Sequence, residues 1–263
     1  MVMLVDVSKI SVKLQKLKKM LKDTGIRLGS GVSVEDAEAF KRRKKLVAFD
    51  LDGTLIENEC IDELAKAAGV YDEVKEITRK AMEGEIDFRE ALRRRVKLLK
   101  GLPVKEVEKI KRKLRISQGA EELVSELKKA GFITAIISGG FDVFAEHVAS
   151  ILGIDYVYAN GLKVRAGRLT GEVEERIVTP RDKLEALREI ASREGISLRE
   201  CVAIGDGAND IFLLRGSGLG IGYNPKSSLK KHVDAILKTR DLKPVLALIG
   251  VSQTSQDVKK RIG

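Results

Sequence analysis

Between Ala120 and Ile221 the chain alternates helical segments with short apolar runs, and this alternation restricts the fold more than any other feature of the sequence. Helices are predicted over 120–130, 143–152, 182–194 and 210–215, with two more over 227–232 and 242–248. Strands are predicted over 132–137, 156–159, 201–204 and 219–221. Such alternation is typical of an α/β fold, a doubly wound parallel sheet with helices on both faces.

One more strand is predicted before these elements, and it ends in acids. The strand is predicted over the run Leu46-Val47-Ala48-Phe49, which is apolar throughout, as expected of a strand buried on both faces. It is followed by Asp50-Leu51-Asp52-Gly53-Thr54. Side chains two residues apart in extended chain lie on the same side, so Asp50 and Asp52 bring two like charges together. The motif indicates a magnesium-assisted nucleophile with an acid/base partner. A surface Asp-Gly turn is the alternative interpretation of so short a motif.

Two segments interrupt the α/β pattern. From Asn58 to about Leu114 the pattern is helical, with breaks near Gly69, Gly84 and 101–103, so a helical insertion is expected. Residues 162–175 contain two alternating runs around a turn at 165–168, which predicts a short β-hairpin. The expected organisation is a helical extension over 1–44, with an amphipathic helix at 7–23, a core over 45–57 and 115–250, a cap over 58–114 and a tail over 251–263.

Composition narrows the class of protein. The 263 residues are 43% hydrophobic, enough for a sizeable core, and no run approaches the ~20 apolar residues of a membrane helix. We therefore expect a cytoplasmic protein without a membrane partner. The net charge of +10 is interleaved with 39 acids, which argues against a nucleic-acid partner. Cys60 and Cys201 lack metal-ligand spacing and are expected to be core thiols.

Three predicted strands end in polar residues that should converge. Asp50 follows one strand, Ser138-Gly139-Gly140 follows another, and residues 205–210 follow a third. Ligands of doubly wound sheets bind outside the carboxyl ends of the strands, so Asp206 and Asp210 should join the first acid pair. Such an oxygen-rich site favours Mg²⁺ over zinc and suits phosphoryl transfer. Ser138 and Lys183 are the expected donors to phosphoryl oxygens.

With these residues the chain resembles the haloacid dehalogenase superfamily, and within it the phosphoserine phosphatases. The superfamily resemblance is carried, in order, by DLDGT, by the strand-end serine of IISGG, by Lys183 and by GDGAND. The closer resemblance is carried by residues 57–65, 81–84, 88–96 and 138–142. Together these similarities extend from about Lys45 to Ile249, so the first 44 residues are not covered.

The resemblance implies catalytic roles. Asp50 would attack phosphorus and form an aspartyl-phosphate, while Asp52 would protonate the departing seryl oxygen and then activate water. Mg²⁺ would be held by the Asp50 side chain, the Asp52 backbone carbonyl and Asp206, and Asp210 would order the surroundings of the metal.

The resemblance also implies substrate contacts. The residues that would hold the phosphoryl group or the bound substrate are Ser138, Gly139, Lys183 and Asn209. Glu59 would bind the substrate ammonium and Arg95 its carboxylate, which is sensible because arginine binds carboxylates through two donors. Met82 and Phe88 would close over the substrate from the cap.

These implications predict a Mg²⁺-dependent hydrolysis of O-phospho-L-serine, the last step of serine biosynthesis. Two alternatives stay open: transfer of the phosphoryl group to a small alcohol such as homoserine, and a non-catalytic protein that binds nucleic acid on its basic surface. The extension over 1–44 could form a homodimer or pack on the cap, and the sequence does not choose.

Overall fold

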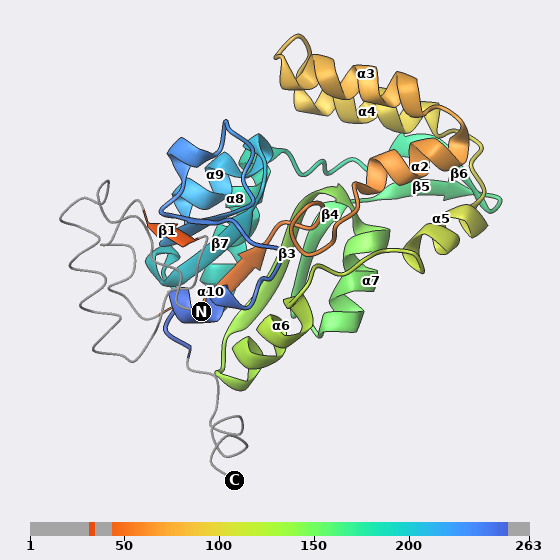
Figure 1. The fold of residues 1–263 in the computed structure, drawn as a ribbon. Coiled ribbons are helices and arrows are strands. Elements are labelled where there is room, and N and C mark those ends of the chain that lie inside the picture. Colours follow the sequence, from red (N-terminus) through yellow and green to blue (C-terminus); the bar gives the residue numbers. More distant parts are fainter. Residues whose placement is uncertain (1–31, 35–43, 252–263) are drawn as a thin grey trace.

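A computed structural model describes residues 32–34 and 44–251 (Figure 1). The predicted helix at 7–23 and all but the first residue of the predicted tail lie outside these ranges, and the homodimer stays a prediction. Within the described ranges, no helix has the length and apolar character needed to span a bilayer.

The core is a seven-stranded sheet in the order β1-β9-β8-β7-β2-β3-β4. Its strands are β1 Val32–Val34, β2 Leu46–Phe49, β3 Ile133–Phe141, β4 Tyr156–Asn160, β7 Cys201–Gly205, β8 Leu219–Tyr223 and β9 Ala235–Leu237. β1 pairs antiparallel with β9, and the other neighbours pair in parallel. The carboxyl ends of the six parallel strands therefore share one edge.

Helices cover both faces of this sheet (Figure 1). They are α6 Ala120–Lys129, α7 Asp142–Leu152, α8 Pro180–Arg193, α9 Ile211–Gly216 and α10 Pro244–Leu248. Val47 and Phe49 belong to one apolar cluster with α6, α7 and α10, while Leu46 and Ala48 belong to a second with α8 and α9. Successive side chains of a strand point to opposite faces, so an uninterrupted apolar run fills both cores. The predicted doubly wound fold is confirmed.

Four helices follow β2 and stand to one side of the sheet, at the upper right of Figure 1. They are α2 Cys60–Ala68, α3 Tyr71–Met82, α4 Phe88–Leu98 and α5 Val104–Lys111. The hairpin of β5 Leu162–Arg165 and β6 Arg168–Val173 lies with them. Its turn has positive φ at Ala166 (50°) and Gly167 (71°), as a tight two-residue hairpin turn requires.

In the described part of the chain, the hairpin is hydrogen-bonded to the helical insertion and not to the seven-stranded sheet. Gly101 donates its N–H to the Leu169 carbonyl, and Leu169 donates back to the Leu102 carbonyl, both at 2.9 Å. The Leu169 side chain is buried in the same apolar cluster as Leu102. Residues separated by 67 and 68 positions in sequence thus form one structural unit.

Several predicted elements are wrong in detail. The strands β1 and β9 were not expected, because three residues are too short to show a period and each depends on its neighbour for pairing. The predicted helix over 227–232 is only a 3₁₀ turn, Lys230–His232. α8 begins two residues earlier than predicted, since Thr179 and Asp182 form a capping box and Pro180 occupies the first turn.

Candidate active site

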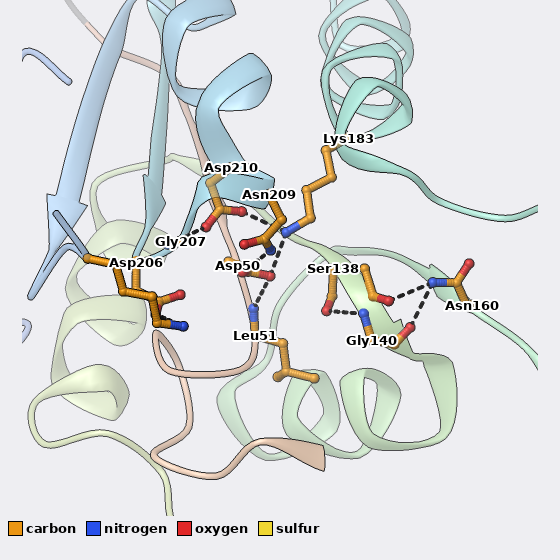
Figure 2. Close-up of polar contacts among 12 residues, drawn as sticks. Asp50, Leu51, Ser138, Gly140, Asn160, Lys183, Asp206, Gly207, Asn209 and Asp210 are labelled. Atoms are coloured by element: carbon orange, nitrogen blue, oxygen red, sulfur yellow. Dashed lines mark hydrogen bonds and ion pairs between the residues drawn. The ribbon is translucent and has the colours of Figure 1, made fainter. Parts of the chain in front are cut away.

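The polar ends of β2, β3 and β7 meet at one place, together with the start of α8 (Figure 2). Lys183 Nζ lies 2.8 Å from Asp50 Oδ1 and 2.7 Å from Asp210 Oδ1, and all three side chains are buried. Asn209 donates to Asp50 Oδ2 at 3.2 Å, and the Leu51 N–H donates to Asp50 Oδ1 at 2.8 Å. The predicted convergence of these strand ends is therefore present.

Lys183 is the buried cation of this cluster. It lies in the first turns of α8, whose capping box and Pro180 set the direction in which the helix begins. Burial by itself lowers the pKa of this ammonium, but the charges of Asp210 and Asp50 outweigh burial and hold the pKa above its usual value. Lys183 therefore keeps its proton and stabilises the negative charge of Asp50.

Asp52 has a different environment from Asp50 although only one residue separates them. Its Oδ1 accepts a hydrogen bond from the Cys60 backbone N–H at 3.1 Å. Burial raises the pKa of Asp52 to about 7, the charges of Glu59 and Asp50 act in the same direction, and the hydrogen bonding with Cys60 opposes them. A carboxyl group in such surroundings can hold a proton near neutral pH, which is the state of a general acid.

The segment Ser138–Gly140 faces Asp52. A β-carbon at Gly140 would lie 2.7 Å from Asp52 Oδ2 and 3.1 Å from Ser138 Oγ, so only glycine fits between them. The Gly140 N–H donates to Ser138 Oγ at 2.9 Å, which leaves the hydroxyl proton available for another acceptor. Phe88 from α4 lies close to Gly139, because a β-carbon there would be 3.0 Å from the Phe88 ring.

Asn160 orients this segment and was not predicted. Its side-chain N–H group donates to the carbonyls of Gly139 at 2.8 Å and Gly140 at 3.1 Å (Figure 2). Its oxygen accepts the Val178 N–H at 2.7 Å. The side chain is fully buried. It could have been predicted from its position directly after the predicted strand over 156–159, at the same edge as the other polar residues.

A cation site is compatible with the acids of this cluster. Carboxylate oxygens of Asp50, Asp206 and Asp210 lie within 4.8 Å of one another, and all three residues are buried. Gly53, at φ +70°, turns the chain close to Asp206, because a β-carbon there would be 3.0 Å from that carboxylate. Three carboxylates outnumber the two neighbouring ammonium groups, those of Lys183 and Lys226, which suits a divalent cation such as magnesium. The Asp52 side chain is not in this group.

Glu59 and Arg95 lie on the insertion side of the site. Glu59 is the N-terminal flanking residue of α2 and makes no capping hydrogen bond with its side chain. Its carboxylate is half-exposed and 3.6 Å from Lys226 Nζ, which also lies 3.2 Å from Asp206. Lys226 was not predicted, since its segment showed no strand-end or helix-start pattern. It joins the insertion side to the acidic cluster.

Arg95 is partly buried on α4. Burial lowers the pKa of its guanidinium, and the charges of Asp62, Glu59 and Asp52 oppose that effect. The two predicted cap residues differ: Phe88 contacts the Ser138–Gly140 segment, whereas Met82 is 76% exposed. The closing role of Met82 stays a prediction.

Comparison with known proteins agrees with this geometry. Residues 47–215 match the model of the haloacid dehalogenase-like hydrolases. The chain is 43% identical over 247 residues to a phosphoserine phosphatase of Archaeoglobus fulgidus, covering 94% of this chain and 71% of the relative. It is 46% identical over 209 residues to a phosphoserine phosphatase of Methanocaldococcus jannaschii, covering 80% of this chain and 99% of the relative.

Among solved structures, the fold is similar to that of a phospho-aspartyl intermediate analogue of a phosphoserine phosphatase. The TM-score is 0.73 at 47% identity, over 78% of this chain and 98% of the other. Sequence and structure agree, and the chain belongs to the haloacid dehalogenase-like hydrolases and, within them, to the phosphoserine phosphatase family.

Proposed function

We propose that this protein hydrolyses O-phospho-L-serine to L-serine and phosphate, with Asp50 as nucleophile and Asp52 as general acid and base. The observation that carries the proposal is the contrast between these two carboxyl groups. Asp50 is in contact with the Lys183 ammonium and the Asn209 amide, whereas burial raises the pKa of Asp52 to about 7. Two neighbouring acids in such different environments can divide the roles of nucleophile and proton donor.

In the first half of the reaction an oxygen of Asp50 attacks phosphorus, and the bond between phosphorus and the seryl oxygen breaks. Asp52 gives its proton to that oxygen, so serine leaves as a neutral alcohol and the phosphoryl group stays on Asp50. The position of Asp52 Oδ2 beside Gly140 supports this role, because the neighbouring Ser138 hydroxyl would bind the phosphoryl group.

In the second half, the Asp52 carboxylate accepts a proton from water. The water oxygen attacks phosphorus, the bond to Asp50 breaks, and inorganic phosphate leaves. Asp50 is then a free carboxylate and Asp52 again carries its proton. The similarity to the phospho-aspartyl analogue structure supports the covalent intermediate.

The phosphoryl oxygens would be held by groups that surround the point of attack: Ser138, Gly139, Lys183 and Asn209. The Ser138 hydroxyl has a free proton, and Asn160 donates to the Gly139 and Gly140 carbonyls and so fixes this segment. Donors that are fixed before the substrate arrives cost no reorganisation during the reaction.

We propose Mg²⁺ as the cofactor, held by the Asp50 side chain, the Asp52 backbone carbonyl and Asp206, with Asp210 ordering the surroundings. When bound, it supplies positive charge that screens the phosphate from Asp50 and stabilises the transition state. The clustering of buried carboxylates supports this assignment.

The insertion over 58–114, together with the β5–β6 hairpin, would act as the cap over this site. From it, Arg95 would bind the carboxylate of phosphoserine and Glu59 the ammonium. Charge supports the assignment: Glu59 lies close to an ammonium in this structure, that of Lys226, and Arg95 is surrounded by acids but has donors left for an anion.

The test is a screen of phosphorylated metabolites with magnesium, with serine and phosphate measured separately. Phosphoserine should be the preferred substrate, the two products should form in equal amounts, and a chelator should abolish turnover until magnesium is restored. Serine produced without equal phosphate in the presence of homoserine would instead indicate phosphoryl transfer. No magnesium-dependent turnover on any ester would contradict the proposal.

A further inference from the structure

Arg95 is held by two neighbouring helices. Its Nε donates to the Ala91 carbonyl of its own helix at 3.3 Å, and its Nη1 donates to Thr78 Oγ1 on α3, also at 3.3 Å. A guanidinium has five N–H groups in a rigid plane. In the described part of the chain these are its two hydrogen bonds, so three N–H groups, including both on Nη2, are left for an anion.

The Thr78 hydroxyl is oriented to accept from Arg95. Its proton is donated to the Val74 carbonyl, one turn earlier in α3, at 3.0 Å. A hydroxyl has one donor and two acceptor positions, so this bond turns the lone pairs away from the α3 backbone. The Arg95 Nη1–H occupies one of those positions. α3 thereby fixes the rotation of a side chain that belongs to α4.

The surroundings of Arg95 explain why such a support is useful. The acids whose charges act on this guanidinium are Asp62, Glu59 and Asp52. A long and flexible side chain could turn toward any of them and lose its alignment with an incoming carboxylate, and ordering it during binding costs entropy. An uncharged acceptor on a rigid helix holds the arginine without competing for its charge.

We propose that Thr78 positions Arg95 for the substrate carboxylate and so sets the preference of this enzyme for a phosphorylated amino acid over simpler phosphate esters. The inference rests on the function proposed above. It makes α3 part of the specificity machinery, although α3 contributes no group that touches the reacting atoms.

A purely structural role for Thr78 makes a different prediction. Serine and threonine often donate to a carbonyl of the preceding helical turn, and Ser150 does so with the His147 carbonyl on α7 at 2.7 Å. If the hydroxyl of Thr78 served only this local bond, its loss would change stability and would affect all substrates equally.

The experiment compares Thr78→Val, which keeps the shape and removes the hydroxyl, with Thr78→Ser, which keeps it. Steady-state constants are measured on phosphoserine and on phosphoethanolamine, which lacks the carboxylate but keeps the ammonium. We expect Thr78→Val to raise KM for phosphoserine about two- to tenfold, the range of one hydrogen bond, with kcat and the constants for phosphoethanolamine unchanged. Thr78→Ser should restore the native KM, and Ser150→Ala is the matched control without an arginine partner.

Equal changes on both substrates, no change on phosphoserine, or a Thr78→Ser variant no better than Thr78→Val would each overturn the inference. Failure of the proposed function gives a separate result, because the wild-type enzyme would then show no preference for phosphoserine over phosphoethanolamine before any variant is made.

Discussion

The strand-end cluster and the insertion side of the site differ in the burial of their side chains and in the length of their polar contacts. Lys183, Asp50 and Asp210 are almost completely buried and are joined by contacts of 2.7 and 2.8 Å. Glu59 is half-exposed with its nearest cation at 3.6 Å, and both Arg95 bonds are 3.3 Å long. The chemical groups are thus in place before a ligand arrives, whereas on the insertion side Glu59 has a distant cation that a ligand ammonium can replace. General phosphoryl chemistry and substrate choice are in this way separated in space.

The largest effect should come from Asp50→Asn. The amide keeps the size of the side chain but cannot act as nucleophile, so we expect kcat to fall by about 10⁴-fold or more on every substrate. Thermal unfolding should be nearly unchanged, since Lys183 still has Asp210. Asp72→Asn, at an exposed position of α3, is the control. Near-native turnover by Asp50→Asn would contradict the assignment of Asp50 as nucleophile.

Lys183→Met should damage both activity and stability. Loss of a group that stabilises developing charge is expected to cost about 10²–10³ in kcat. The substitution also leaves Asp50 and Asp210 buried without their cation, which should lower the free energy of unfolding by roughly 3–5 kcal/mol. Denaturant titration and kinetics would measure both effects, with the exposed Lys113→Met as control. A stable variant with unchanged kcat would show that the cluster is not preorganised around this lysine.

The variants Arg95→Ala and Glu59→Gln test the insertion side of the site. Each charge-assisted contact is worth roughly 1.5–3 kcal/mol, so kcat/KM on phosphoserine should fall about ten- to a hundredfold. A small aryl phosphate, which has neither charged group, should be hydrolysed as before. Equal losses on both esters would assign these two residues to phosphoryl binding. They would contradict the separation of phosphoryl chemistry at the strand ends from substrate recognition on the insertion side.

The smallest effect concerns Asp182, which joins the two regions through a 3.0 Å ion pair with Arg89 of α4. Burial acts to raise the pKa of Asp182, but hydrogen bonds from Thr179 and the charge of Arg89 outweigh it and hold the pKa below the ordinary 3.8. A lowered pKa adds stability above 3.8 that disappears as the pH falls through the folded-state value. The side chain is 40% exposed, so the contribution is screened.

Asp182→Asn should therefore lower the free energy of unfolding by less than about 1 kcal/mol at pH 7, with the difference from wild type closing at low pH. Denaturant titrations at both pH values would measure it. A difference that persists under acidic conditions would assign the effect to the shape of the helix cap instead of to charge.

The strand-end residues could be predicted because their positions follow from local pattern. An apolar run predicts a strand, parallel strands share an edge, and Asp50, Ser138 and Asp206 follow three such runs. Thr78, Asn160 and Lys226 could not be found this way, because their roles depend on which helix or loop packs beside them. Thr78 meets Arg95 only through the packing of α3 on α4, which no period in the sequence encodes. β9 was missed for the same reason, since its three residues become a strand only beside β8.

The attachment of the β5–β6 hairpin to the helical insertion has a consequence for how the protein is made. A ribosome releases α2–α5 long before residues 162–173, yet Leu169 of the hairpin fills part of the apolar cluster that those helices share. The apolar cluster of the insertion lacks the Leu169 side chain while α2–α5 leave the ribosome. Part of its apolar surface therefore stays exposed until β3, α7, β4 and then the hairpin have been synthesised. The insertion and the sheet are therefore expected to reach their final state together, late in synthesis, so that a premature stop before Leu169 would leave an aggregation-prone fragment and not a folded domain.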